Sequence, residues 1–144
     1  MASIYTAALM EHNAHPDYKY EMDEPTCTLD GVNPSCGDEL TLALRLDGNL
    51  IKEAAFTGHG CAVSQAAADM MADLVTGETV DEARRLTALY LGMIKGKPLT
   101  DAQREDLDEA AELESIARMP ARVKCAELAW RTLEALLDQQ IAQT

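Results

Sequence analysis

The hydrophobic periodicity of residues 40–75 changes once along the chain, and this change constrains the fold more than any other sequence feature. Leu40–Leu46 alternates leucine with other residues, which is the period of two expected for a strand with one buried face. Asp47-Gly48-Asn49 is a hairpin turn signal, and Leu50–Thr57 is predicted to be the returning strand. The period then becomes about 3.6 residues, which predicts a helix that begins at or beside Cys61.

The flanking segments predict further helices and one long loop. Ser3 is the predicted N-cap of a short helix that ends near Ala14, because Pro16 follows. His15–Asp38 is rich in turn-forming residues and is predicted to be mostly loop, with a short strand at Thr26–Leu29. Capping signals and apolar stripes predict a helix from Thr79 to Gly96, an acidic segment opened by Thr100 with Gln103, and a last helix through Val123–Leu137. The predicted fold class is α+β: a small antiparallel sheet of about three strands packed against several helices.

Length and charge restrict the class of protein. The 144 residues fit one domain, spanning 1–144, and 25 acidic against 12 basic side chains give a net charge of -13, which disfavours nucleic acid as a partner. No apolar run is long enough to span a membrane, and no basic residue precedes Lys19 as a secretory leader would require. A cytoplasmic location is therefore expected. Phosphate-loop, dinucleotide and Ser/His/Asp signatures are absent from the sequence.

Four cysteines are the main chemical signal. Cytosolic thiols are kept reduced, so free, metal-bound or reactive cysteines are expected rather than disulfides. Cys36, Cys61 and Cys125 lie at the ends of predicted elements, and such ends can converge on one surface. Because a helix N-terminus favours thiolate, the pKa values of Cys61 and Cys125 are predicted to be lowered. Cys27 lies in an extended segment and is expected to be a packed or partly exposed thiol.

A carboxylate lies close to the first of the three junction cysteines. Asp38 follows Cys36 by two residues, and three thiolates with one carboxylate would complete a tetrahedral site suited to zinc or iron-sulfur chemistry. There is no C-x-x-C pair, so spacing alone leaves open an ordinary turn carboxylate and small buried thiols. His59 is an alternative fourth ligand or a side chain that covers the site, whereas His12 and His15 are expected at the surface.

Three ordered motifs give the chain a family resemblance. They are Asn33–Asp38 (NPSCGD), Phe56–Ala66 (FTGHGCAVSQA) and Arg122–Trp130 (RVKCAELAW), and together they resemble the iron-sulfur scaffold superfamily, most closely its SufU-type branch. IscU-type scaffolds have a histidine just before the third motif cysteine, where this chain has Lys124. The stretch Leu86–Ser115 also resembles the SufU insertion.

The resemblance implies a fold, a metal site and an activity. The fold would be SufU/IscU-like, and Cys36, Asp38, Cys61 and Cys125 would bind one zinc ion. The implied activity is that of a zinc-dependent sulfurtransferase, in which Cys36 accepts persulfide sulfur from a pyridoxal-phosphate cysteine desulfurase of SufS type, for iron-sulfur cluster assembly. A desulfurase histidine would replace Cys36 on the metal during transfer.

Two other functions remain open at this point. The same cysteines would serve a non-enzymatic scaffold on which a transient 2Fe-2S cluster is assembled and passed to downstream assembly proteins. A purely structural zinc domain is the third hypothesis, although closed structural sites use cysteine and histidine, which counts against it given Asp38. Arg122 and Lys124 either neutralise the thiolate cluster, contact a partner or are ordinary surface charges.

Overall fold

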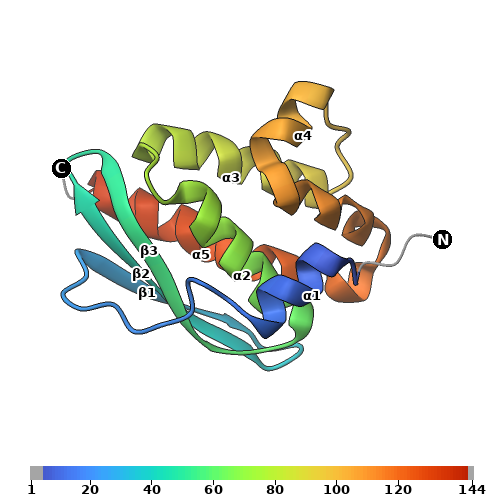
Figure 1. Ribbon diagram of the computed structural model, residues 1–144, viewed down its shortest axis with the longest axis horizontal. Helices are drawn as coiled ribbons and strands as arrows, with labels where there is room; N and C mark the ends of the chain where they lie inside the picture. Colours follow the sequence, from blue (N-terminus) through green and yellow to red (C-terminus); the bar gives the residue numbers. More distant parts are fainter. Residues whose placement is uncertain (1–4, 143–144) are drawn as a thin grey trace.

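The computed structural model describes residues 5–142 and confirms the α+β prediction. Its sheet has three antiparallel strands in the order β1-β2-β3 (Figure 1): Cys27–Asn33, Asp38–Asp47 and Leu50–His59. The helices are α1 (Ala7–Ala14), α2 (Ala62–Val75), α3 (Val80–Ile94), α4 (Asp101–Leu107), the 3-10 helix η1 (Asp108–Arg118) and α5 (Pro120–Ala142). Strands and helices therefore follow the predicted order.

The core lies between one face of the sheet and the helices. Helices α2 and α5 pack on that face, with α1 against α2 and α3 against α5 (Figure 1). Leu40, Leu42 and Leu44 all point into this core, as the alternation in β2 predicts. Trp130 of α5 is fully buried and stacks on Tyr90 of α3 with ring centroids 4.4 Å apart, which joins the second layer of helices to the first.

Strand β1 is longer than the sequence predicts. Cys27–Asn33 pairs with β2 along its whole length, so Asp30-Gly31 lies inside a strand and does not form a turn. A Cβ atom on Gly31 would lie 2.1 Å from Oγ1 of Thr132, which shows how closely α5 approaches the strand. Glycine is therefore required here by close packing between two elements, a role that glycine often has in strands.

The predicted helix ends are largely confirmed. Cys61 is the N-cap of α2, and Thr100 and Gln103 form a capping box at α4, whereas α5 begins at Pro120, before the predicted stretch Val123–Leu137. The first helix differs, because Thr6 is its N-cap and accepts a hydrogen bond from the backbone N–H of Leu9. The predicted cap, Ser3, lies outside the described residues.

His12 does not lie free at the surface as predicted. Its side chain is 15% exposed and bridges two acids, with Nδ1 2.6 Å from Oδ2 of Asp69 and Nε2 2.9 Å from Oε1 of Glu109. Asp69 is buried in α2 and also accepts a hydrogen bond from the backbone N–H of Tyr18. His12 thus connects α1 to both α2 and η1, while His15 is exposed as expected.

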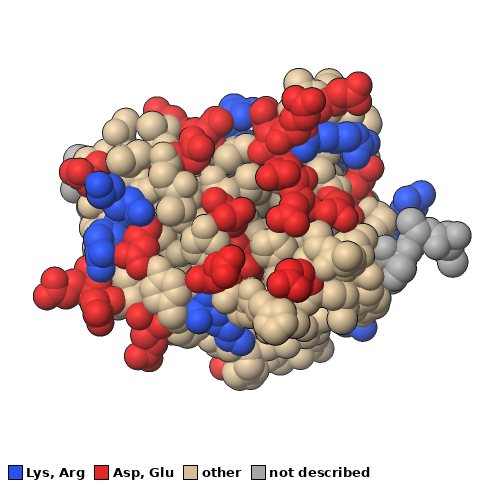
Figure 2. Space-filling model, viewed as in Figure 1, with Lys and Arg blue, Asp and Glu red and all other residues tan. Residues whose placement is uncertain are grey.

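The surface carries the acidic excess of the sequence. In the view of Figure 2, acidic side chains clearly outnumber basic ones. Several acids are paired, as in the contacts of Arg85 with Glu82 and Asp106 and of Arg84 with Asp138. No helix among residues 5–142 is long and apolar enough to cross a membrane.

Candidate metal and thiol site

Three of the predicted site residues meet at one end of the sheet. One ligand atom each from Cys36, Asp38 and Cys125 lies within 4.8 Å of the others. The Cys36 sulfur is 3.5 Å from the Cys125 sulfur and donates a 2.8 Å hydrogen bond to Oδ2 of Asp38. These residues come from the loop between β1 and β2, from the first residue of β2 and from the second turn of α5.

Asp38 is the buried centre of this arrangement. Its side chain is almost fully buried, and its Oδ1 accepts a 2.9 Å hydrogen bond from the backbone N–H of Cys61. Burial alone would oppose ionisation, but hydrogen bonds from Cys36, Cys61, Cys125 and Ser64 outweigh it and lower the pKa of Asp38. Asp38 is therefore an ionised carboxylate that connects the loop cysteine to the start of α2.

The pKa of the Cys125 thiol is raised, whereas the sequence predicted that it would be lowered. Burial raises its pKa, and hydrogen bonds with Cys36, Cys61 and Asp38 raise it further. The predicted lowering by the helix N-terminus is wrong for Cys125, because the residue lies in the second turn, is 1% exposed and faces other acidic groups. Without a cation, these groups cannot all be negatively charged together at low cost.

Cys61 joins the site through its neighbours. It is half-buried at the N-cap of α2, its backbone N–H donates to Asp38, and its thiol lies near enough to Cys125 to raise the pKa of that thiol. All four residues predicted as ligands therefore come together, although the Cys61 sulfur is not among the three ligand atoms that cluster within 4.8 Å.

Exposure separates the thiols of the site. Cys36 is exposed, whereas Cys125 and Asp38 are buried beneath it. Gly37 follows Cys36 with a φ of +73°, a conformation that glycine adopts readily, and so allows the tight loop before β2. Cys36 is consequently the thiol of the site that another protein can approach most easily.

His59 and Cys27 lie apart from the cluster of Cys36, Asp38 and Cys125. The His59 side chain is 73% exposed, and its Nε2 lies 3.5 Å from a Glu39 carboxylate oxygen. Cys27 is half-buried in β1 opposite Leu44, where burial raises the pKa of its thiol. The expectation of a partly exposed, packed thiol is met by Cys27.

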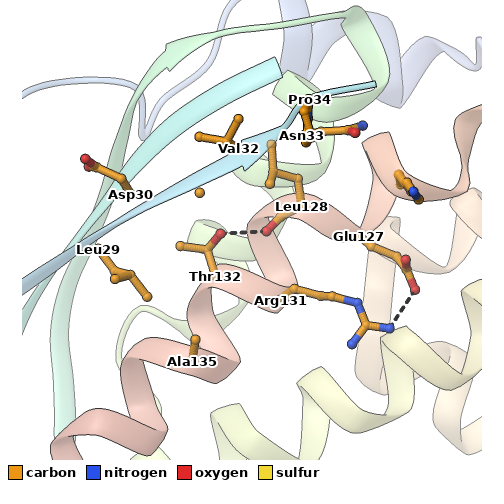
Figure 3. A pocket seen from close by; sticks show the side chains of 12 residues that line it. Leu29, Asp30, Val32, Asn33, Pro34, Glu127, Leu128, Arg131, Thr132 and Ala135 are labelled. Carbon is orange, nitrogen blue, oxygen red and sulfur yellow. Dashed lines mark hydrogen bonds and ion pairs between the residues drawn. The ribbon is translucent and has the colours of Figure 1, made fainter. Parts of the chain in front are cut away.

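The two basic residues of the third motif have different surroundings. Interactions with Tyr5, Cys125 and Cys61, in decreasing order, raise the pKa of Arg122, so its guanidinium lies close to the thiols. Figure 3 shows a groove between β1 and α5, and Lys124 is one of the residues that line this groove. In Figure 3, Asn33 and Pro34 mark the end of the groove nearest the loop that carries the first site cysteine.

The sequence patterns predicted a close backbone approach at Gly60 but did not identify two other residues that support the site, Asn33 and Ser64. Asn33 donates a 2.9 Å hydrogen bond from Nδ2 to the Cys36 sulfur, and the buried Ser64 donates a 3.0 Å hydrogen bond from Oγ to the backbone carbonyl of Cys61. A Cβ atom on Gly60 would lie 2.6 Å from Oδ1 of Asp38. Asn33 and Ser64 belong to the quoted motifs, but their contacts depend on tertiary structure that spacing does not reveal.

Comparison with known proteins finds relatives that match most of this chain. The family model described as the NifU-like N terminal domain matches residues 4–92. The zinc-dependent sulfurtransferase SufU of Bacillus subtilis is 33% identical over 132 residues, which cover 92% of this chain and 88% of that protein. The iron-sulfur cluster assembly scaffold protein IscU of Streptococcus pyogenes is 35% identical over 94% of this chain and 84% of its own length.

A solved structure extends the likeness to the fold. The SUF-system iron-sulfur cluster assembly scaffold protein of Fervidobacterium islandicum is 33% identical, covers 93% of this chain and 96% of its own, and superposes with a TM-score of 0.87. The matches to SufU and to this structure cover nearly the whole chain, whereas the family model ends before the third motif. The chain therefore belongs to the NifU-like N-terminal domain family of the IscU/NifU superfamily.

Proposed function

We propose that this protein is a zinc-dependent sulfurtransferase that accepts persulfide sulfur from a SufS-type cysteine desulfurase for iron-sulfur cluster assembly. One observation carries the proposal: an exposed thiol, Cys36, lies directly over a buried Asp38 and Cys125. The relative named a zinc-dependent sulfurtransferase matches nearly the whole chain and supports the same activity. The chain carries Lys124 before the third motif cysteine, as SufU-type proteins do.

The donor set fits zinc. Cys36, Asp38, Cys61 and Cys125 would hold the ion, and three thiolates with one carboxylate suit a tetrahedral zinc site. The buried acidic groups around Cys125 also favour a bound cation, because their mutual repulsion raises the cost of ionisation. When bound, zinc would keep the thiols deprotonated at neutral pH.

The transfer step is a thiolate exchange at sulfur. The Cys36 thiolate attacks the outer sulfur of the desulfurase persulfide, and a new sulfur–sulfur bond forms as the bond to the desulfurase cysteine breaks. The electron pair leaves with the desulfurase sulfur as thiolate, and the persulfide proton stays with the transferred sulfur. No external oxidant or reductant is consumed. Because Cys36 is exposed on a short loop, its sulfur can enter the partner's site.

The test compares two cysteine variants of the same chain. Cys36→Ala should abolish sulfur acceptance from a persulfidated SufS-type desulfurase, followed by mass spectrometry of the intact chain. Cys27→Ala is the matched control, because that thiol is half-buried in β1 and lies outside the cluster. Sulfur acceptance by Cys36→Ala at the wild-type rate would refute the proposal.

A second candidate function uses the same residues. Relatives named IscU scaffold proteins match this chain as closely as SufU does, which favours assembly of a 2Fe-2S cluster as cargo on the three thiols. Metal analysis after anaerobic purification separates the two functions. Stoichiometric zinc together with faster desulfurase turnover supports sulfur transfer, whereas a coloured iron-sulfur form without that stimulation supports the scaffold.

A further inference from the structure

Asn33 uses its backbone carbonyl and its side-chain carboxamide to build the loop that carries Cys36. It is the last residue of β1, pairs with Asp38 across the sheet and is 5% exposed. Its Oδ1 accepts a 3.2 Å hydrogen bond from the backbone N–H of Ser35, and its backbone carbonyl accepts from those of Cys36 and Gly37 at 3.3 and 3.0 Å. The side-chain oxygen and the carbonyl therefore fix the four-residue loop.

The carboxamide nitrogen of Asn33 contacts the Cys36 sulfur directly. Nδ2 donates a 2.9 Å hydrogen bond to the Cys36 sulfur, which in turn donates to Oδ2 of Asp38. Asn33 cannot act as a thiolate or carboxylate ligand, and its amide N–H groups can only donate. A buried donor thus contacts an exposed nucleophile from the protein side, leaving the outer side of the sulfur open to a partner.

We propose that Asn33 is the positioning residue for sulfur acceptance, holding the Cys36 sulfur where it meets the outer sulfur of an incoming persulfide. This inference rests on the proposed sulfurtransferase function. A cysteine on an exposed loop can rotate among three staggered χ1 positions, and attack requires one of them. The hydrogen bond from Asn33 favours the rotamer in which the sulfur lies over Asp38. Holding a nucleophile in reactive geometry speeds the step without changing how tightly the partner binds.

Two substitutions separate the hydrogen bond to sulfur from the fold of the loop. Asn33→Asp keeps an oxygen for the Ser35 N–H but replaces the Nδ2 donor with an acceptor, whereas Asn33→Ala removes both. Ser35→Ala is the matched control, because the contact with Asn33 uses only the Ser35 backbone. Urea unfolding followed by Trp130 fluorescence verifies that each variant is folded.

The decisive measurement is single-turnover sulfur acceptance at increasing desulfurase concentration. Both Asn33 variants should accept sulfur at a maximal rate about tenfold lower, with an unchanged half-saturating desulfurase concentration, and Ser35→Ala should match the wild type. Wild-type maximal rates in both Asn33 variants would overturn the inference. A slow Asn33→Ala with a normal Asn33→Asp would also overturn it, because only the loop would then matter.

A second readout does not depend on activity. The NMR signals of the Asn33 carboxamide are compared between ¹⁵N-labelled wild-type protein and two labelled variants. They should shift in Cys36→Ala and keep their wild-type positions in Cys27→Ala. Unshifted signals in Cys36→Ala would overturn the contact and the inference. If the wild type shows this contact yet accepts no sulfur, the sulfurtransferase function is wrong, and the positioning role fails with it for that separate reason.

Discussion

Because Gly60 has no side chain, the carboxylate of Asp38 can lie directly against its backbone. A Cβ atom built on Gly60 would lie 2.6 Å from Oδ1 of Asp38 and 2.5 Å from Oγ of Ser64. Both distances are shorter than van der Waals contact permits, so any side chain at residue 60 must displace the buried carboxylate or the serine. The glycine before Cys61 is thus explained by the carboxylate beside it.

Gly60→Ala is therefore expected to disturb the site and the fold together. A methyl group forced against the buried Asp38 carboxylate costs about 1–3 kcal/mol of the free energy of unfolding, and the displaced Asp38 should also lower zinc content after purification. Gly92→Ala is the control, because its Cβ would meet only the flexible Lys97 side chain at 3.3 Å. Equal unfolding free energies for Gly60→Ala and the wild type, measured in urea, would contradict the prediction.

Asp38 has two separable roles, one toward the thiols and one toward α2. Asp38→Asn keeps an oxygen that can accept from the Cys61 N–H but removes the negative charge, so zinc content should fall while the fold is retained. Asp38→Ala should lose zinc as well and, in addition, about 1–3 kcal/mol of unfolding free energy through the unsatisfied N–H. Metal analysis with urea unfolding checks both. Wild-type zinc content in both variants would show that the carboxylate is no ligand.

The close approach of β1 and α5 predicts coupling between Gly31 and Thr132. Gly31→Ala should lower the unfolding free energy by about 1–3 kcal/mol, because the new Cβ overlaps Oγ1 of Thr132. Adding Thr132→Ala removes that oxygen and should recover part of the loss. A double-mutant cycle of urea unfolding measures the coupling, and additive effects of the two substitutions would argue against the contact.

Hydrophobic periodicity and turn residues correctly predicted the elements that depend on short stretches of sequence. The β2–β3 hairpin and the start of α2 follow from periodicity and turn chemistry, and Cys36 and Cys125 meet as their positions at element ends suggested. Strand β1 was predicted only in part, because Asp30-Gly31 has the composition of a turn. Its conformation depends on pairing with β2 and on packing against α5, and neither is visible in a short window.

Burial and contacts between residues far apart in sequence explain why the predictions for Cys125 and His12 were wrong. The predicted lowering of the Cys125 pKa considered the helix end alone, whereas the folded chain buries the thiol beside other acidic groups. His12 was placed at the surface because its partners, Asp69 and Glu109, are 57 and 97 residues away in sequence. Such contacts become predictable only when the packing of α1, α2 and η1 is known.

The His12 bridge predicts a pH dependence of stability. Burial alone would lower the pKa of His12, but hydrogen bonds to Glu109 and Asp69 outweigh it, and the pKa is raised above its usual 6.5. The folded state therefore binds a proton more tightly than the unfolded state. The stabilisation is complete below about pH 6.5 and is lost as the pH rises through the folded-state pKa.

His12→Ala should consequently destabilise the protein more at low than at high pH. At about pH 6 we expect a loss of about 1–2 kcal/mol of unfolding free energy, and at about pH 8.5 a clearly smaller loss, because neutral imidazole makes weaker hydrogen bonds to carboxylates. Trp130, the single tryptophan of the chain, is fully buried and reports urea unfolding by fluorescence. His15→Ala should leave stability unchanged at both pH values, since His15 is exposed. A His12→Ala loss of equal size at both pH values would mean that the bridge contributes through packing, without the charge of the imidazolium.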